Sequence, residues 1–342
     1  MEIRKLTQAY YKQYHDFLMG KKESLIYYSL EYRNLLVNLL QCDSDYLIVV
    51  EKGNILGILP LMIKNGKYGK IINSLPFFGS NGGILAADKE AYRLLLKEYN
   101  KIVNNKDAAA ATLISNPLID QDYSQISCDL TDKRIGQWTL IPNKEDPEES
   151  LMNSFHYKTR NMIRKGQKSG IIVQKDNGCM EFIKNTHIEN MKAIGGKSKS
   201  NLFFSLVGSH FQCEIDYNIY TASKDGQLIA GLLAFYFNQK VEYFTPVVKK
   251  EFRTFQPLSL IIYHAMIDAA QKGFTWWNWG GTWLTQEGVY RFKKRWGAID
   301  KEYTYYTKIN NREIFNNRKE DLLYHYDNFY VIDFKKLHSC KD

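Results

Sequence analysis

The chain is poor in cysteine and histidine, and neither residue type forms a recognisable site. Its five cysteines are scattered through 342 residues without a CxxC pair or a zinc-like Cys/His spacing, so no metal site is expected. An odd, scattered set of thiols is typical of a reducing cytoplasm. The seven histidines are equally dispersed, and His156 and His264 are interpreted as structural. Nucleophilic serine or cysteine catalysis therefore finds no support.

Long apolar segments are also missing. The N-terminal stretch "MEIRKLTQAYYKQY" lacks the apolar core of a signal peptide. The longest apolar run, "LIAGLLAFYF" at residues 228–237, is about half of the ~20 residues that a membrane-spanning helix needs. We therefore expect a cytoplasmic protein that can still make peripheral contact with a membrane.

The composition is that of a globular protein, with 44% hydrophobic and 24% charged residues. The length allows one large domain or two of ordinary size. The formal net charge of +9, from 46 Lys+Arg against 37 Asp+Glu, favours phosphates, polyanions or an anionic membrane surface as partners. The same excess can serve solubility alone, so charge does not choose a function.

Two stretches of the chain repeat one pattern. They read "YLIVVEKGNILGILPLMIKNGKYGKIINSLPF" at residues 46–77 and "YNIYTASKDGQLIAGLLAFYFNQKVEYFTPVV" at residues 217–248. Each has a β-rich run, a turn with Gly53 or Gly226, and an apolar strand with an internal Gly57 or Gly231, followed by a third strand. The matching glycines predict a duplicated antiparallel meander.

A helix and a strand are expected after each meander. Asp88 can cap a helix that runs to about Asn104, before the strand "AAAATLIS". Pro257 suits the first turn of a second helix that Gly273 ends, before the strand "FTWWNW". The predicted fold class is α+β, with two tandem domains, each a mixed, mostly antiparallel sheet flanked by helices. The charged linker "PNKEDPEES" places their boundary between residues 1–145 and 146–342.

Three stretches in this order carry a family likeness. They are "SLPFFGSNGG" (residues 74–83), "HYKTRNMIRKGQKSGI" (156–171) and "WNWGGTWLTQEGVYRFKKRWGA" (277–298). With the tandem arrangement, they resemble the GNAT acyltransferase superfamily and, within it, the Fem-type peptidyltransferases (FemA, FemB and FemX). The resemblance implies two GNAT-like domains, the second of which carries the donor site.

Proteins of this kind pass an acyl group to an amine without a permanently bound cofactor. The resemblance implies an acyltransferase that acts on a small or lipid-linked amine of a cell-envelope precursor, peptidoglycan or a surface sugar. The donor is aminoacyl-tRNA in Fem-type members and acyl-CoA in GNAT relatives, and both stay open here. The chain departs from the family at "KKEFRTFQPLSLI" (residues 249–261), which has no glycine where coenzyme A relatives hold the pyrophosphate. It also has Asn278 where the family often has Asp.

The stretch from residue 277 onward supplies most of the candidate site. Phe292 and Lys293 resemble the Phe-Lys pair of the Fem-type family. The resemblance implies that Lys293 faces the reacting carbonyl, where a cation would stabilise an oxyanion by a few kcal/mol. Val289, Phe292 and Trp296 are expected to hold its helix against the sheet. Lys294 and Arg295 in the last helical turn suit the helix dipole. The other candidates here are Glu287 and Tyr290 for proton uptake, and Gly280, Gly281, Trp283 and Asn278 for substrate binding.

Further binding residues come from the other two matching stretches and from residues 249–261. Ser74 and Asn81 are assigned to the acceptor side. Arg160 and Arg164 lie on a basic helix face that either binds phosphates or is only solvated. Arg253, Gln256 and Ser259 are the residues that could replace a glycine-rich donor cradle.

Two rival functions stay open. One is a catalytically inactive GNAT-fold protein for binding or assembly, which the Asn278 substitution would suit. The other is a nucleic-acid-binding protein, suggested by the net charge and 14% aromatic residues. That reading ranks last because RRM, KH and helix-turn-helix signatures are absent, and DNA is not expected as a partner.

Overall fold

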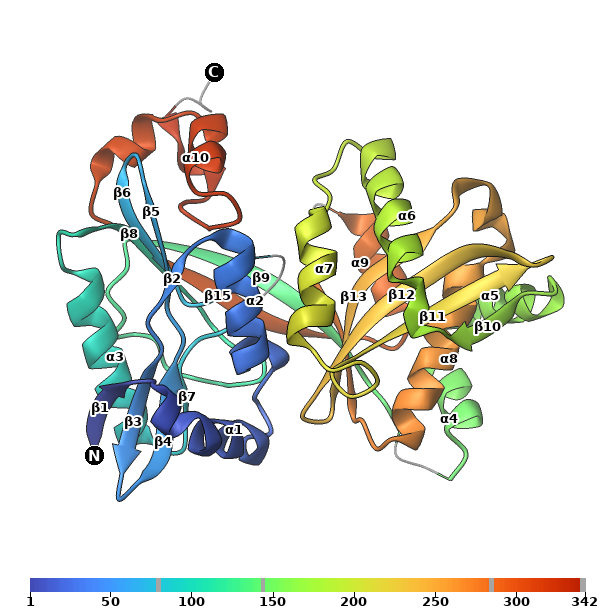
Figure 1. The fold of residues 1–342 in the computed structure, drawn as a ribbon, viewed down its shortest axis with the longest axis horizontal. Coiled ribbons are helices and arrows are strands. Elements are labelled where there is room, and N and C mark those ends of the chain that lie inside the picture. Colours follow the sequence, from blue (N-terminus) through green and yellow to red (C-terminus); the bar gives the residue numbers. More distant parts are fainter. Residues whose placement is uncertain (78–80, 143–144, 283–285, 339–342) are drawn as a thin grey trace. The chain divides into compact units, whose positions relative to one another are not determined.

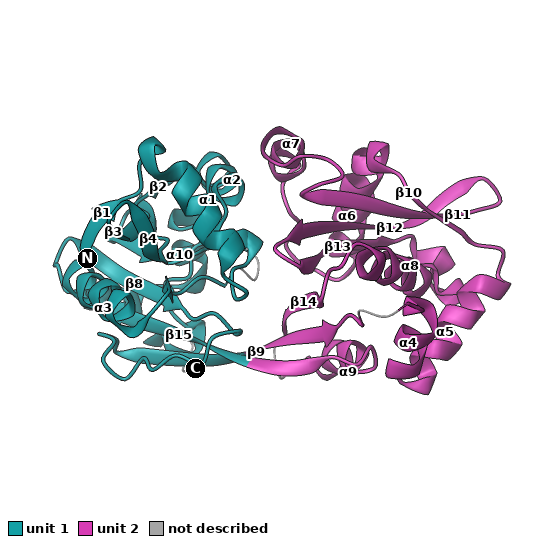
Figure 2. Cartoon of the chain, turned by 90° about the horizontal axis from the view of Figure 1, so that it is seen from below, with its two compact units in different colours: residues 1–134, 302–342 teal, residues 135–301 magenta. Residues whose placement is uncertain are grey.

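The computed structural model describes residues 1–77, 81–142, 145–282 and 286–338 (Figure 1). The chain forms two compact units, unit 1 from Met1–Arg134 and Glu302–Asp342, and unit 2 from Ile135–Lys301 (Figure 2). Strands β9 (Leu130–Leu140) and β15 (Ile299–Ile309) each run from one unit into the other. Both units combine mixed sheets with helices, as predicted.

Unit 1 contains two groups of strands. An antiparallel sheet has the order β1-β3-β4-β7, and a mixed group has the order β15-β8-β6-β5-β2 with β6 and β8 parallel. Helix α3 (Lys89–Val103) packs on β3 and β4, and Asp88 caps it by accepting a hydrogen bond from the Ala91 N–H, as expected. The remaining elements of this unit are β1 (Glu2–Lys5), α1 (Tyr11–Gly20), α2 (Leu30–Leu40), β2 (Asp43–Ser44), β3 (Leu47–Glu51), β4 (Asn54–Leu59), β5 (Met62–Gly66), β6 (Gly69–Asn73), β7 (Leu85–Ala86), β8 (Ala108–Ile114) and α10 (Lys319–His325).

The first meander departs from the expected three strands. Its middle strand is broken at Pro60 into β4 and β5, which belong to different groups of strands. Proline has no N–H to donate to a sheet, so the strand can change partners there. The corresponding strand of unit 2, β12 (Gln227–Phe237), continues unbroken and absorbs its bend in a register shift between Leu233 and Ala234.

Unit 2 contains one mixed sheet with the order β10-β11-β12-β13-β14-β9. All its neighbouring strands are antiparallel except β13 and β14, which are parallel, as predicted from the intervening helix. Its other elements are α4 (Pro147–Ser154), α5 (Tyr157–Lys168), β10 (Ile172–Lys175), α6 (Met180–Ala193), α7 (Asn201–His210), β11 (Tyr217–Lys224), β13 (Lys240–Val248), α8 (Pro257–Gln271), β14 (Trp276–Thr282) and α9 (Glu287–Lys294).

The two faces of the unit 2 sheet carry different helices. Helix α8 is buried along most of its length between the sheet and helices α4 and α5, and it forms the centre of the main core with Trp277, Trp279 and Trp296. Helix α6 covers the opposite face. A Cβ on Gly231 would lie 2.5 Å from the Ile183 Cδ1 atom, so glycine lets this helix approach the sheet. Alternate residues of each strand therefore face either α8 or the α6 side.

The compact units divide the chain differently from the predicted boundary at residue 145. The first unit ends at Arg134, and the last part of the chain returns to it. Strand β15 pairs with β8, and the Tyr326 hydroxyl accepts a hydrogen bond from the Tyr68 N–H and donates one to the Gly69 carbonyl. Pairing between segments about 190 residues apart leaves no local signal, whereas a charged linker does.

Candidate functional site

The strands β13 and β14 form a fork. They pair in parallel at only three positions, the last of which joins Glu242 to Asn278. Beyond that position β14 pairs only with β9 on its other side, after an irregularity between Asn278 and Gly281. Gly280 has a φ of +73°, a left-handed conformation that favours glycine. The sheet therefore opens at the double glycine.

A carboxylate and an amide lie at the base of this fork. Glu242 and Asn278 are 3% and 1% exposed, and the Asn278 Nδ2 atom donates to the Glu242 Oε2 atom at 2.7 Å. The Asn278 Oδ1 atom accepts a hydrogen bond from the Gly280 N–H at 2.8 Å. Because both ends of the amide are engaged, its orientation is fixed and it ties the carboxylate to the glycine turn.

Lys293 reaches the same turn from helix α9. Its Nζ atom donates to the carbonyls of Gly280 (3.3 Å) and Gly281 (3.0 Å) and to the Thr282 hydroxyl (2.8 Å). The lysine is only 6% exposed, and burial lowers its pKa from 10.5 to about 8. An ammonium group has three donors, and here three acceptors of β14 engage them.

The network continues from Thr282 into strand β9. The Thr282 hydroxyl donates to the Gln137 Oε1 atom at 2.8 Å, and the Gln137 amide donates to the Tyr290 carbonyl at 3.3 Å. One hydrogen-bonded network thus links Glu242 to helix α9 through Asn278, the glycine turn, Lys293 and Gln137. This network, which we call the fork network, is the candidate site.

Helix α9 is held by only part of the predicted apolar face. Phe292 packs edge-on against Trp279 and Trp296, and Trp296 packs at a tilt against Trp279, with ring centroids 5.7 to 6.2 Å apart. Val289 is 44% exposed, so its predicted packing against the sheet is wrong. It lies in the first turn of a helix only two turns long, and the sheet contacts come from the other end.

The two proposed proton acceptors on α9, Glu287 and Tyr290, contact side chains outside the fork network. Glu287 is exposed and pairs with Arg291. The Tyr290 hydroxyl donates to Asp300 at 2.6 Å, and this hydrogen bond raises the pKa of the phenol. Neither side chain contacts Glu242, Asn278 or Lys293 among the described hydrogen bonds. Trp283 lies outside the described residues.

The acceptor-side candidates belong to unit 1. The buried Ser74 hydroxyl accepts a hydrogen bond from the Ile114 N–H at 2.9 Å, so it joins the ends of β6 and β8. Asn81 is also buried, and its side chain approaches the Tyr303 hydroxyl, whose pKa is raised chiefly by burial. The Ser74 contact stabilises the β6–β8 pair, and the role of both residues in acceptor binding stays a prediction.

The basic helix α5 packs against the start of α8. A Cβ on Gly166 would lie 3.1 Å from the Leu260 Cβ atom, so the two helices approach closely. The Arg160 guanidinium donates to the Phe155 carbonyl at 2.6 Å, whereas Arg164 is exposed. Leu151, Phe155 and Ile163 are buried in the core of unit 2.

The three predicted donor-side residues meet at the first turn of α8. Gln256 has a φ of +63° although it is not glycine, and its amide donates to the Arg253 carbonyl. The buried Ser259 hydroxyl donates to the Gln256 Oε1 atom at 3.4 Å. The side chain of Gln256 therefore occupies the turn where the coenzyme A relatives have glycine. No described side chain caps the N-terminus of α8, and Pro257 in its first turn has no N–H to donate.

The buried ionisable residues that the sequence did not suggest include Lys199, His187 and Glu242. Lys199 lies over the Phe244 ring at 4.9 Å, and its N–H donates to the His187 Nε2 atom. Burial lowers the pKa of Lys199 to about 8 and, with the neighbouring lysine charge, that of His187 to about 4. Glu242 was missed too, although a charged residue inside the apolar strand "KVEYF" is a signal. Lys199 has no comparable signal.

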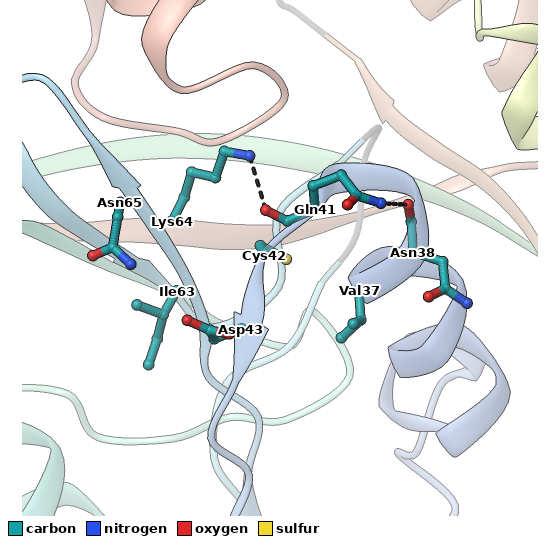
Figure 3. A pocket seen from close by; sticks show the side chains of 8 residues that line it. All are labelled: Val37, Asn38, Gln41, Cys42, Asp43, Ile63, Lys64 and Asn65. Carbon is teal, nitrogen blue, oxygen red and sulfur yellow. Dashed lines mark hydrogen bonds between the residues drawn. The ribbon is translucent and has the colours of Figure 1, made fainter.

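A pocket of about 350 Å³ in unit 1 contains none of the candidate residues (Figure 3). Its Lys64 donates to the carbonyls of Leu40 and Gln41 and so completes the C-terminus of α2. The pocket is lined by Val37, Asn38, Gln41, Cys42, Asp43, Ile63, Lys64 and Asn65.

Within the described ranges, no three His, Cys, Asp or Glu side chains lie together as metal ligands. The same ranges contain no helix with the length and apolarity needed to cross a bilayer.

Comparison with known proteins agrees with this fold. The sequence model of the FemAB family matches residues 210–304, which include the whole fork. Among solved structures, FemX superposes with a TM-score of 0.68 at 16% identity and covers 92% of this chain and 99% of its own. No curated protein matches the sequence.

Two further structures share the fold. A C-terminal domain (DUF2156) from Agrobacterium fabrum, named for a lysylphosphatidylglycerol synthetase, has a TM-score of 0.56 at 10% identity and covers 94% of this chain and 98% of its own. A tandem GNAT protein from the clavulanic acid biosynthesis pathway has a TM-score of 0.53 at 12% identity and covers 90% of this chain and 98% of its own. The predicted tandem fold is confirmed, and the chain is a Fem-type relative with the GNAT fold.

Proposed function

We propose that the protein is an aminoacyltransferase that moves an aminoacyl group onto an amine of a cell-envelope precursor. The observation that carries the proposal is the fork network, where a buried carboxylate, a fixed amide and a buried lysine converge on a glycine turn. The match to the FemAB family covers this part of the chain, and FemX shares the fold. The acceptor that we propose is a peptidoglycan or surface-sugar precursor, small or lipid-linked.

The fork suits attack of an amine on an ester carbonyl. Backbone groups without a Cβ at Gly280 and Gly281 permit close approach of the donor, and proximity supplies much of the rate. Acceptors of β14 engage all three N–H donors of the Lys293 ammonium group. We therefore propose that Lys293 holds the carbonyls of the glycine turn in place and supplies a positive charge there. This role replaces direct contact between its ammonium group and the reacting carbonyl.

Aminoacyl-tRNA is the donor that we propose over acyl-CoA. The turn before α8 contains the Gln256 side chain and no glycine, which does not suit a pyrophosphate held by successive backbone N–H groups. The exposed cations of α5, including Arg164, offer contacts to an RNA backbone. Asn278, in place of the family's frequent Asp, favours a second candidate, an inactive binding or assembly protein.

A donor and acceptor panel tests the proposal. Purified protein is incubated with radiolabelled aminoacyl-tRNA or acetyl-CoA, each with a UDP-linked muropeptide or its lipid-linked form. We expect label on the acceptor from aminoacyl-tRNA only. Lys293→Ala should lower the rate at least tenfold, whereas Lys294→Ala, whose side chain pairs with Asp300 at the surface, should leave it nearly unchanged. Binding of both substrates without transfer would instead support the inactive protein.

A further inference from the structure

Helix α7 exposes a face that carries no formal charge. Its sequence, "NLFFSLVGSH", has no Asp, Glu, Lys or Arg, although Asn201, Leu202 and Ser205 are exposed. A surface helix normally turns charged residues toward water, as α3 does with Arg93 and Lys97. The exposed face of α7 is therefore less strongly hydrated than that of a usual surface helix.

The connection between α6 and α7 lies at one end of both helices and exposes two aliphatic side chains (Figure 1). Ile194, the residue after α6, is 70% exposed, and Leu202 is exposed in the first turn of α7. Lys192 and Lys197 lie on either side of Ile194 in the chain and are exposed too. We call these four residues the α6–α7 tip.

Hydrogen bonds hold the tip in one conformation. The Gly196 N–H donates to the Met191 carbonyl at 2.9 Å, which ends α6 in a tight turn. The Lys199 N–H donates to the His187 Nε2 atom of α6 at 3.0 Å, and the Ser200 side chain caps α7. The connection is thus anchored at both ends, so little conformational freedom is lost when the tip meets another surface.

The formal charge of this segment is of one sign. Residues 190–213 include three lysines but no Asp or Glu, and two of these lysines belong to the tip. Lysines attract an anionic bilayer surface, and aliphatic side chains beside them can enter the layer below the lipid phosphates. RNA would attract the same lysines but gain little from Ile194 and Leu202, because bases stack on aromatic rings and guanidinium groups. The combination therefore fits an anionic lipid surface.

We propose that the α6–α7 tip docks on an anionic lipid bilayer, with its lysines at the lipid phosphates and Ile194 and Leu202 in the interfacial layer. The purpose of docking rests on the proposed function, because a lipid-linked acceptor presents its amine at the surface of a bilayer. Docking raises the effective concentration of the protein near that acceptor. The docking step itself requires neither donor nor acceptor.

Co-sedimentation with vesicles measures docking without substrates. The full chain is mixed with vesicles of phosphatidylcholine alone, or of equal amounts of phosphatidylglycerol and phosphatidylcholine. We expect binding to the anionic vesicles only, and weaker binding as the salt concentration rises. The pair Ile194→Ser and Leu202→Ser should weaken binding about tenfold, and the pair Lys192→Gln and Lys197→Gln should weaken it at least as much at low salt.

Matched controls come from the edge strand β10. Ile172 is 65% exposed and Lys175 is exposed, so Ile172→Ser with Lys175→Gln removes side chains of the same kind and should leave vesicle binding unchanged. No binding of wild-type protein to anionic vesicles, or equal binding by wild-type protein and the tip variants, would overturn the proposal. A loss of tRNA affinity or of self-association in Ile194→Ser, with vesicle binding unchanged, would show that the tip contacts RNA or a second copy instead.

Transfer assays separate this proposal from the proposed function. The tip variants should transfer at the wild-type rate to a UDP-linked muropeptide, but about tenfold more slowly to its lipid-linked form in anionic vesicles. Equal rates of wild-type protein and tip variants on the lipid-linked form would contradict the role of the tip. Vesicle binding that depends on the tip, without transfer from any donor, would refute the proposed function alone and support docking.

Discussion

Lys293 provides the most quantitative test of the fork network. Its amine is buried against three acceptors of β14, and burial lowers its pKa from 10.5 to about 8. The lowering corresponds to about 3 kcal/mol in favour of the neutral amine. The pKa of Lys293 is lower in the folded than in the unfolded state. Its contribution to the free energy of unfolding is therefore fully present above pH 10.5 and is lost as the pH falls through 8.

Replacement of Lys293 by methionine separates the apolar stem from the amine. At pH 7 the variant loses the hydrogen bonds to the turn but is relieved of a buried charge, so these effects largely offset each other. We expect a loss of about 1 kcal/mol there. At pH 9.5 the lysine of the folded wild-type protein is already neutral, so the substitution no longer removes a buried charge. The loss in the free energy of unfolding should therefore be about 2 kcal/mol larger than at pH 7.

The assay can be confined to unit 2. All six tryptophans lie between residues 138 and 296, so their fluorescence follows the unfolding of this unit in urea. Lys294→Met is the matched control, because Lys294 is exposed and its stability effect should be equal at both pH values. A Lys293→Met effect that is constant or shrinks between pH 7 and pH 9.5 would refute the argument.

Three further predictions concern the surroundings of the fork. Gly280→Ala should destabilise unit 2 by about 1 kcal/mol in urea denaturation, because its φ is +73° while no atom obstructs a Cβ. Charge reversal of Arg160 and Arg164 together should weaken tRNA binding and reduce its dependence on salt concentration. Unchanged affinity would show that the basic face of α5 is only solvated and does not bind phosphates. Tyr290→Phe and Glu287→Gln should each transfer within about threefold of wild type, since neither side chain contacts the fork network; a loss of tenfold or more would restore them as proton acceptors.

Much of the secondary structure of both units could be predicted because its signals are local. Asp88 as a helix cap, Pro257 in a first turn and Gly273 after a helix each act within a few residues. The break at Pro60 has a local signal too, but its effect on strand pairing depends on which strands are neighbours in the fold.

The site was predicted less completely, because its contacts join distant segments. Gly280, Gly281, Asn278 and Lys293 lie within 16 positions of one another, and the structure brings them together in one network. Glu242 joins them only through the parallel pairing of β13 and β14, which is 36 residues away along the chain. The burial of Lys293 also could not be predicted, since lysine is rarely buried and the sequence placed it facing a substrate.

The most direct test of transfer at the fork is a crystal structure with a stable mimic of the aminoacylated tRNA 3′ end, in which an amide replaces the reactive ester. We predict that the aminoacyl carbonyl lies beyond the last β13–β14 pair, beside Gly280. A mimic bound at another site in a structure with an unoccupied fork would contradict the account.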